Sequence, residues 1–413
     1  MQIGIVGLPF SGKSTLFQTI TKTHIDSAVS AKAESHQAVI KVPDERLDKL
    51  TGIFNPKKKV KATIEVIDVV GLQKGDSGST QFTSNFLGKV KTNDALIQVV
   101  RLFENDAVPH PDNTINMMRD IDSFETEFII SDMEIVEKRL ENIKKQIMKT
   151  KDEQLKRELP VLEKCNEILQ KETPLREEKL SNDELKILRS YQLLSAKPML
   201  IALNLDENQV DDANKLLDEL VKKKLEKNTK ALTFFGKIEL EMSDLADEEA
   251  EVFMEEYGIK ESALNSLIRE SYNLLGLHSF FTVGEDECRA WTIKKGMNAQ
   301  EAAGEIHTDF FKKFIRAEVV HYDDFIDDGS VAKAKEKPAV PIKKSITPDY
   351  LICLEDGMKF KMLKRHLRAT YGLSPDDYRA RWGLGSDYPM VAPNYAKLRS
   401  ALAKQIGLGK SRA

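Results

Sequence analysis

The chain has 413 residues, of which 41% are hydrophobic and 31% charged, and its net charge is −4 at pH 7. This length exceeds that of one hydrophobic core, so about two to four domains are expected. The composition is typical of a soluble, globular, helix-rich protein. The longest apolar runs, such as residues 95–100, are far shorter than the roughly 20 residues that cross a bilayer. We therefore expect no membrane partner.

The three cysteines, Cys165, Cys288 and Cys353, lie far apart in the sequence. This spacing argues against a disulfide framework and for a reducing compartment. The sequence also runs from Met1 directly into an apolar strand-like segment, without a basic and then apolar leader. A cytoplasmic protein is expected.

Charge is distributed unevenly along the chain. Residues 340–413 contain 14 Lys and Arg but only 6 Asp and Glu, a net charge of +8, so the residues before them carry −12. Such asymmetry suggests that the C-terminal part binds a polyanion. A basic domain that is merely soluble is the alternative.

Apolar runs that read as strands alternate with helical segments in the first two thirds of the chain. This rhythm predicts an α/β fold with a mostly parallel sheet and helices on both of its faces. The expected strands are residues 2–6, 62–69, 95–103, 199–204 and 231–235.

A phosphate-binding motif follows the first expected strand. Residues 7–14 match G-x-x-x-x-G-K-[ST] and precede an apolar helix. Backbone N–H groups of the loop and the helix N-terminus can surround phosphate oxygens, while Lys13 reaches the β- and γ-phosphates and Ser14 binds Mg²⁺. A structural glycine turn is the weaker alternative. The predicted nucleotide-binding residues of this loop are Gly7, Pro9, Phe10, Ser11, Gly12, Lys13, Ser14 and Thr15.

A D-x-x-G motif at residues 68–71 supports the phosphate site. Asp68, at the end of an apolar strand, is predicted to join Ser14 around Mg²⁺, and the N–H of Gly71 to sense the γ-phosphate. Leu72 follows, where many GTPases place a water-orienting glutamine. Lys13 and Gly71 are therefore predicted catalytic residues of a site that hydrolyses slowly or positions its water with another group.

Base recognition is expected from residues 204–207, which read N-x-x-E instead of N-K-x-D. A guanine-specific site needs an aspartate that accepts hydrogen bonds from guanine N1 and N2. Glu207 in that place removes this geometry, so Asn204 and Glu207 predict a site for ATP. A chance turn of this sequence is the alternative.

The rest of the chain suggests three further parts. Two amphipathic stripes joined by a polar turn predict an antiparallel coiled-coil hairpin over residues 123–195, inserted into an NTPase domain of residues 1–122 and 196–277. Pro160 is expected to bend its second arm. Residues 278–333 read as a small α+β domain with strands at 280–283, 289–292 and 314–322 and a helix at 298–311. A linker (334–345) and a helical module (346–413) follow.

Six segments of the first 335 residues resemble the YchF/Obg-like ATPases. The resemblance implies a GTPase-type domain with an inserted hairpin and a C-terminal TGS domain, preference for ATP, Mg²⁺ with K⁺ as a second candidate cation, and association with ribosomes or translation factors. It also implies that His110 helps to position water as a catalytic residue. The segments are residues 7–17, 68–72, 100–106, 204–207, 289–292 and 306–310.

Three departures from that family pattern bear on hydrolysis more than on binding. The switch I stretch 29–34 has Lys32 where the threonine falls, and residues 78–81 replace a glycine-rich switch II stretch. The TGS domain is expected to lack its closing strands after about Lys335. Residues 349–360, which read as strand–turn–strand, are an alternative source of those strands.

Residues 340–413 resemble the Ros/MucR family of bacterial transcriptional regulators, which implies a DNA-binding domain. The match rests on residues 345–350, 353–357, 360–367, 378–382, 387–393 and 402–404. Phe360, Leu363 and Leu367 are expected on the inner face of one helix. The basic residues Lys361, Lys364, Arg365 and Arg368 on its outer face are the predicted DNA contacts.

Zinc is not expected in this module. Cys353 and His366 stand at ligand positions of zinc-binding relatives, but Asp356 replaces the second cysteine, and Thr370 and Tyr371 stand where the last histidine would be. At most three of the four ligands of a closed structural site are present.

Three functions remain open from the sequence. We expect a slow ATPase switch that acts on the ribosome or a translation factor, with a DNA-binding module appended. The alternatives are a transcriptional regulator whose P-loop part senses nucleotide, and a chimera, natural or engineered, whose halves act independently.

Overall fold

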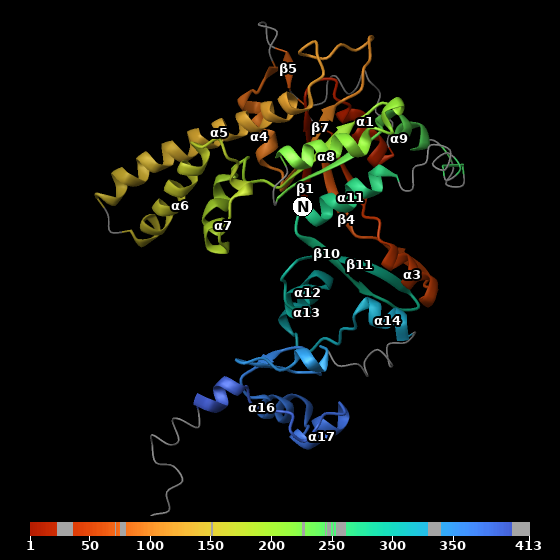
Figure 1. Cartoon of the computed structure of the whole chain (residues 1–413), viewed down its shortest axis with the longest axis vertical. Coiled ribbons are helices and arrows are strands. Elements are labelled where there is room, and N and C mark those ends of the chain that lie inside the picture. The colour runs from red at the N-terminus through yellow and green to blue at the C-terminus, as the bar shows by residue number, and fades with distance from the viewer. Residues whose placement is uncertain are drawn as a thin grey trace, which may run out of the picture. The chain divides into compact units, whose positions relative to one another are not determined.

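The computed structural model describes residues 1–22, 36–70, 72–74, 80–149, 152–224, 228–243, 245, 249–250, 252, 262–328 and 340–398. They fall into two compact units, residues 1–314 and 315–413, which we describe separately (Figure 1). The switch I stretch 29–34, Gly71 and residues 78–79 lie outside the described residues. Among the described residues, no helix combines the length and hydropathy that crossing a bilayer requires.

A six-stranded sheet forms the centre of the first unit, in the order β2-β4-β1-β7-β8-β9. Neighbouring strands are parallel except β2, which pairs antiparallel with β4. All five expected strands are present, so the α/β prediction is confirmed. The bounds are Gln2–Gly7 (β1), His36–Lys41 (β2), Thr63–Asp68 (β4), Ala95–Arg101 (β7), Met199–Asn204 (β8) and Thr229–Phe234 (β9).

Helices cover both faces of this sheet because alternate strand residues enter two different cores. Ile3 and Ile5 of β1 join one core and Val6 joins the other. The first core includes residues of α1 (Lys13–Thr21), α3 (Glu45–Phe54) and α11 (Ala263–Leu274); the second includes residues of α4 (Ser84–Lys91), α5 (Met117–Ile147) and α8 (Ala213–Lys224). β7 and β8 are buried at every position, which explains why their sequences are apolar apart from Gln98, Arg101 and Asn204.

The predicted hairpin is formed by α5 and α6 (Glu153–Leu169), which run side by side in Figure 1. The apolar residues expected at its seam make a core of their own, and α6 continues through Pro160. Across the seam, Arg139 donates two hydrogen bonds to Glu158, of 2.7 and 2.9 Å. Short elements then return the chain to the sheet: Leu175–Glu177 (η1), Asn182–Leu188 (α7) and Arg189–Tyr191 (η2).

A buried carboxylate fastens the hairpin to this returning segment. Asp132 is fully buried, and its two oxygens accept hydrogen bonds from the N–H groups of Leu194 (2.8 Å) and Ser195 (2.7 Å) and from the Ser195 hydroxyl (2.7 Å). Burial raises the pKa of Asp132 to about 6, against the opposing effect of these donors.

A second sheet, of three strands, follows α11. β10 (Leu277–Thr282) and β11 (Glu287–Lys294) are antiparallel, and β3 (Lys58–Val60) pairs parallel with β11. The expected helix 298–311 forms as α12 (Ala299–Ile306) and α13 (Thr308–Lys312), because His307 has extended backbone, with φ −162°. The predicted strand 314–322 is wrong. Residues 314–321 are irregular, and Ile315 and Val319 are largely exposed, without a described strand beside them.

The second unit has a small core around a hairpin of β12 (Leu351–Ile352) and β13 (Lys359–Phe360). The strand–turn–strand interpretation of residues 349–360 is thus confirmed, but among the described residues these strands pair with each other and not with the three-stranded sheet. Phe360 lies in β13 and not on a helix, which corrects that expectation. The remaining elements are Tyr322–Asp328 (α14), Ile342–Lys344 (η4), Leu363–His366 (α16), Leu367–Tyr371 (η5) and Pro375–Arg381 (α17).

We predict that Asp132→Asn lowers the free energy of unfolding by about 1–3 kcal/mol, because the amide nitrogen then faces a backbone N–H that has lost its acceptor. Urea denaturation followed by circular dichroism measures the loss, and hydrogen exchange of the Leu194 and Ser195 amides localises it. Asp183→Asn, at an exposed carboxylate, is the matched control and should change stability by less than about 0.5 kcal/mol.

The same carboxylate gives a pH dependence of known sign. Because the pKa of Asp132 is raised from 3.8 to about 6, the folded state holds a proton that the unfolded state releases. The contribution of Asp132 to the free energy of unfolding therefore falls as pH rises from about 4 to about 6. The difference between wild type and Asp132→Asn should change across that window; a difference independent of pH would contradict the assignment.

Candidate nucleotide site

The phosphate loop connects β1 to α1. Its last residue before the helix, Gly12, has a backbone conformation that only glycine adopts easily. Gly12 has φ 97°, and a Cβ there would lie 2.2 Å from the Asn204 Nδ2. Leu16 N–H donates to the Gly12 carbonyl (2.9 Å), so the helix begins directly from the loop. The loop therefore presents its N–H groups at a helix N-terminus, as phosphate binding requires. Gly7 ends β1, Pro9 and Ser11 lie in the loop, Phe10 is 60% exposed, and Thr15 is in the first turn of α1.

Lys13, Ser14 and Asp68 meet beside this loop, as the sequence predicts. The Lys13 Nζ donates to the Leu8 carbonyl (2.8 Å), and the Ser14 hydroxyl donates to Asp68 Oδ2 (3.1 Å). Burial lowers the pKa of Lys13 to about 8, against the attraction of Asp68. Burial also raises the pKa of Asp68, opposed by Lys13, Ser14 and His36.

The Ser14–Asp68 pair fits a magnesium ion chemically. Both side chains offer hard oxygen donors, which Mg²⁺ prefers. Asp68 is fully buried and its Oδ1 has no hydrogen-bond partner among the described residues. A buried carboxylate oxygen without a partner is costly, so a cation beside it would be stabilising.

Asn204 connects the phosphate loop to the base-recognition region. It is 4% exposed; its Nδ2 donates to the Ser11 carbonyl (3.1 Å), and its Oδ1 accepts from the Gly236 N–H (3.0 Å). Gly236 begins α9 (Gly236–Ser243), directly after β9. The described contacts of Asn204 are thus structural, and they fix the ends of β1, β8 and β9 relative to one another.

Glu207 lies in the 3-10 turn η3 (Glu207–Gln209) and forms an ion pair with Lys237. Both carboxylate oxygens of Glu207 are 3.2 Å from the Lys237 Nζ. Gly236 and Lys237 are absent from the predicted site. A Gly-Lys pair directly after the last strand is the sequence signal that could have found them.

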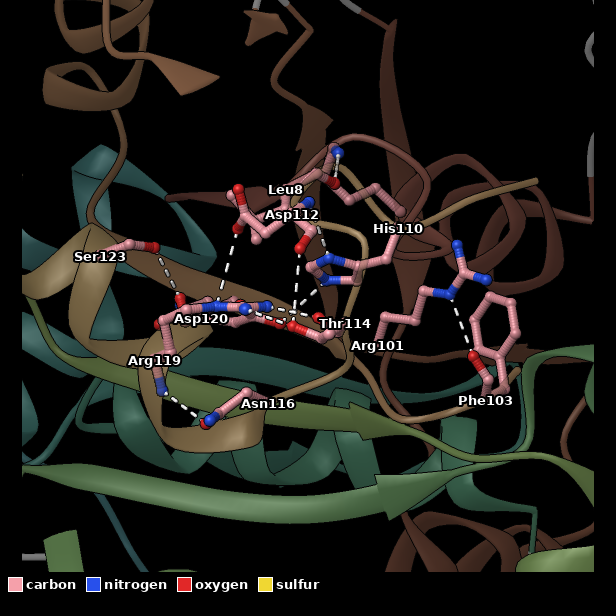
Figure 2. A network of polar contacts seen from close by, with 12 residues as sticks. Leu8, Arg101, Phe103, His110, Asp112, Thr114, Asn116, Arg119, Asp120 and Ser123 are labelled. Carbon is pink, nitrogen blue, oxygen red and sulfur yellow. Dashed lines mark hydrogen bonds and ion pairs between the residues drawn. The ribbon is translucent and has the colours of Figure 1, made fainter. Parts of the chain in front are cut away.

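His110 is buried in a polar network, which Figure 2 shows beside Leu8 of the phosphate loop. Its Nδ1 accepts from the Asp112 N–H (3.1 Å), so the proton is on Nε2, which donates to Asp120 Oδ2 (3.0 Å). The other oxygen of Asp120 accepts from the Arg119 guanidinium (2.9 Å). Both ring nitrogens of His110 are therefore occupied, and a role in positioning water, which stays a prediction, requires breaking one of these contacts.

Leu72 packs against the core that α4, α5 and α8 cover. It supplies no polar group to a water molecule at that position. Gly71 lies outside the described residues, so its predicted role stays a prediction.

The four predicted DNA contacts form a basic surface in the second unit. Lys361 precedes α16, Lys364 and Arg365 lie in α16, and Arg368 follows in η5. All four side chains are exposed, and none makes an ion pair with the described residues. Leu363 and Leu367 on the opposite face are fully buried, so this part of the helix has the expected polarity.

The candidate zinc ligands of the second unit are joined by hydrogen bonds. Ligand atoms of Cys353, Asp356 and His366 lie within 4.8 Å of one another. Asp356 Oδ2 accepts from His366 Nε2 (2.6 Å) and from the Tyr371 hydroxyl (2.9 Å). In the metal-free protein, burial raises the pKa of the Cys353 thiol to about 12. The absence of zinc stays a prediction.

Comparison with known proteins identifies the family. The chain is 40% identical over 344 residues to the ribosome-binding ATPase YchF of Bacillus subtilis, and the alignment covers 82% of this chain and 94% of the relative. The chain belongs to the YchF family. The corresponding protein of Haemophilus ducreyi is 37% identical over 360 residues, covering 87% of this chain and 98% of the relative. The solved structure of the Schizosaccharomyces pombe YchF GTPase matches with a TM-score of 0.70 at 33% identity, over 81% of this chain and 91% of that one.

Two family models match this YchF-family chain at its two ends. Residues 2–136 match a model described as a 50S ribosome-binding GTPase, and residues 293–409 match one described as a ROS/MUCR transcriptional regulator protein. Both resemblances noted in the sequence are thus confirmed. Because 87% of the 413 residues align with the Haemophilus relative, that alignment reaches about residue 360. The YchF likeness therefore extends beyond residue 335 and overlaps the ROS/MUCR match, which begins within β11.

We predict that Asn204→Ala lowers the free energy of unfolding by about 2–4 kcal/mol, because the Ser11 carbonyl and the Gly236 N–H both lose a buried partner. Urea denaturation of the full chain measures the loss. The matched control is Asn208→Ala, at an exposed amide four residues away, which should stay within about 0.5 kcal/mol of wild type. Equal effects of the two substitutions would show that the Asn204 contacts do not hold the site together.

Proposed function

We propose that this chain is a Mg²⁺-dependent P-loop NTPase that prefers ATP, hydrolyses it slowly, and acts as a cytoplasmic switch on the ribosome or a translation factor. The observation that carries the proposal is the meeting of Lys13, Ser14 and Asp68 at a glycine loop that opens a helix. Relatives that share 36–40% identity are named ribosome-binding ATPases. K⁺ stays a candidate on the family resemblance alone.

Each residue of the site has a part in the proposed reaction. Lys13 leaves the Leu8 carbonyl and contacts the phosphate chain, whose negative charge raises its pKa from about 8. Ser14 and Asp68 hold Mg²⁺, which neutralises charge on the phosphates. Loop N–H groups from Gly7 to Ser14 position the β-phosphate.

Preference for ATP is supported by the state of Glu207. Its carboxylate is held by Lys237, and its side chain is one methylene longer than the aspartate that reads guanine. A held carboxylate without the N-K-x-D geometry offers guanine N1 and N2 no matched acceptor.

Slow turnover is supported by the groups that surround the expected position of water. Leu72 is apolar and packed, and both nitrogens of His110 are engaged with Asp112 and Asp120. General-base or positioning catalysis by His110 therefore costs the rupture of a buried hydrogen bond.

The second part of the proposal is DNA binding by residues 340–413. An exposed basic cluster on a short helix, in a segment that matches the ROS/MUCR model, supports it. The alternative, a transcriptional regulator whose P-loop part senses nucleotide, is favoured by the same cluster. A chimera with independent halves predicts that nucleotide leaves DNA affinity unchanged.

We predict that the full chain binds Mg-ATP at least about tenfold more tightly than Mg-GTP, measured by titration calorimetry. Glu207→Asp should lower the ratio of ATP affinity to GTP affinity, because the shorter aspartate side chain matches the residue that reads guanine in N-K-x-D. Glu241→Asp, at an exposed carboxylate of α9, is the control and should leave the ratio unchanged. Tighter binding of GTP by the wild type would overturn the proposed preference.

We predict that the chain shifts an AT-rich DNA duplex in a gel and that its affinity falls steeply with salt. Replacing Lys361, Lys364, Arg365 and Arg368 by alanine should reduce the slope of log K against log salt by about 3–4, since each phosphate contact contributes about 0.9. Lys144→Ala with Lys145→Ala, on the hairpin, is the control. No shift by the wild type at low salt would remove the DNA-binding part of the proposal.

A further inference from the structure

His36 is a half-buried histidine beside the predicted cation site, and it has no part in the proposed reaction described above. It begins β2, and its register partner on the neighbouring strand β4 is Asp68. Residues directly opposite each other in an antiparallel pair lie on the same face of the sheet, with Cβ atoms about 4.5–5.5 Å apart. The side chains of His36 and Asp68 are therefore neighbours.

Contacts with α1 identify the face of the sheet on which this pair lies. The Ser14 hydroxyl donates to Asp68 Oδ2 (3.1 Å). About one turn further along α1, the centre of the Phe17 ring lies 6.2 Å from that of the His36 ring. Both strand side chains thus point toward α1, the helix that follows the phosphate loop. His36 is therefore on the same side of the sheet as the predicted magnesium ligands.

The two neighbouring side chains each have one buried polar atom without a partner. His36 Nε2 and Asp68 Oδ1 make no hydrogen bond to any described residue. Burial raises the pKa of the Asp68 carboxyl, and the groups that oppose this shift are Lys13, Ser14 and His36. Lys13 and Ser14 belong to the P-loop motif, whereas His36 reaches Asp68 from a separate strand. A buried polar atom that stays unsatisfied is costly, so both atoms favour a ligand that supplies hydrogen bonds between them.

The water molecules around a bound cation can supply those hydrogen bonds. Mg²⁺ usually keeps several waters when a protein binds it, and groups that hydrogen-bond around the ligands of a metal site adjust its affinity. We propose that His36 is a positioning residue of the cation site, whose ring nitrogen supports Asp68 through the water shell of Mg²⁺. The inference rests on the proposed Mg²⁺-dependent nucleotide binding and adds a residue that neither the P-loop nor the D-x-x-G motif contains.

Titration calorimetry of the full chain with ADP, first in EDTA and then in Mg²⁺, tests this role. The quantity compared is the factor by which Mg²⁺ tightens the binding of ADP. For His36→Phe we expect this factor to fall about tenfold, as for other residues around metal ligands, while ADP affinity in EDTA stays within about twofold of wild type. His36→Gln, whose amide reaches the position of Nε2, should recover most of the factor.

The same pair of variants separates this role from packing. If His36 only packs on Phe17, the order reverses, with phenylalanine tolerated and glutamine harmful. His278→Phe is the matched control, at a half-buried histidine of β10 whose Nδ1 also lacks a partner among the described residues, and it should leave the Mg²⁺ factor unchanged. Electron paramagnetic resonance of free Mn²⁺, titrated with the ADP complex, measures cation affinity directly and should give the same order of variants.

The outcomes distinguish this inference from the proposed function. Circular dichroism establishes that each variant is folded, and His36→Leu replaces His36→Phe if the latter fails to fold. A Mg²⁺ factor within twofold of wild type in the folded variant would overturn the inference alone. A wild type whose binding of ADP does not respond to Mg²⁺ would overturn the proposed Mg²⁺ dependence and this inference with it.

Discussion

The Asn204 side-chain amide is the contact on which the geometry of the nucleotide site depends. One buried amide holds the carbonyl of Ser11 and the N–H of Gly236, and these belong to segments that follow β1 and β9. Because parallel strands bring their carboxyl ends to one edge of the sheet, ligands bind there, but the loops need a common fixed point. The close approach of Asn204 to Gly12 also excludes any side chain at that glycine.

Around this fixed point the site gathers buried charge. Lys13 is opposed by Asp68, and burial lowers the pKa of Lys13 to about 8 and raises that of Asp68. Such an arrangement is costly in the free protein and becomes favourable when a polyanion enters. Beside the loop, Ser11 Oγ and Asp68 Oδ1 are buried without a hydrogen-bond partner among the described residues.

Sequence patterns predicted the elements whose conformation and burial follow from their own residues. β7 and β8 are apolar at almost every position because both of their faces are covered, and Gly12-Lys13-Ser14 can turn in only a few ways. The pattern failed where the environment is supplied by distant residues. Nothing near His110 in the sequence indicates that its ring will be hydrogen-bonded to Asp120. Likewise, nothing near Glu207 indicates its ion pair with Lys237. Residues 314–322 alternate like a strand, but no described strand lies beside them.

The hairpin of β12 and β13 shows how the two family likenesses can share residues. The YchF alignment reaches about residue 360, and the ROS/MUCR match begins at residue 293, so both include this hairpin. A two-stranded hairpin is only marginally stable alone and requires a surface to pack on. Here Leu351, Cys353 and Leu354 are fully buried in a core shared with Leu363, Leu367 and Tyr378, and the Tyr378 hydroxyl accepts from the Leu354 N–H at 2.7 Å. The helices that carry the basic residues therefore pack on the hairpin. The orientation of the basic surface thus depends on residues that lie within the YchF likeness.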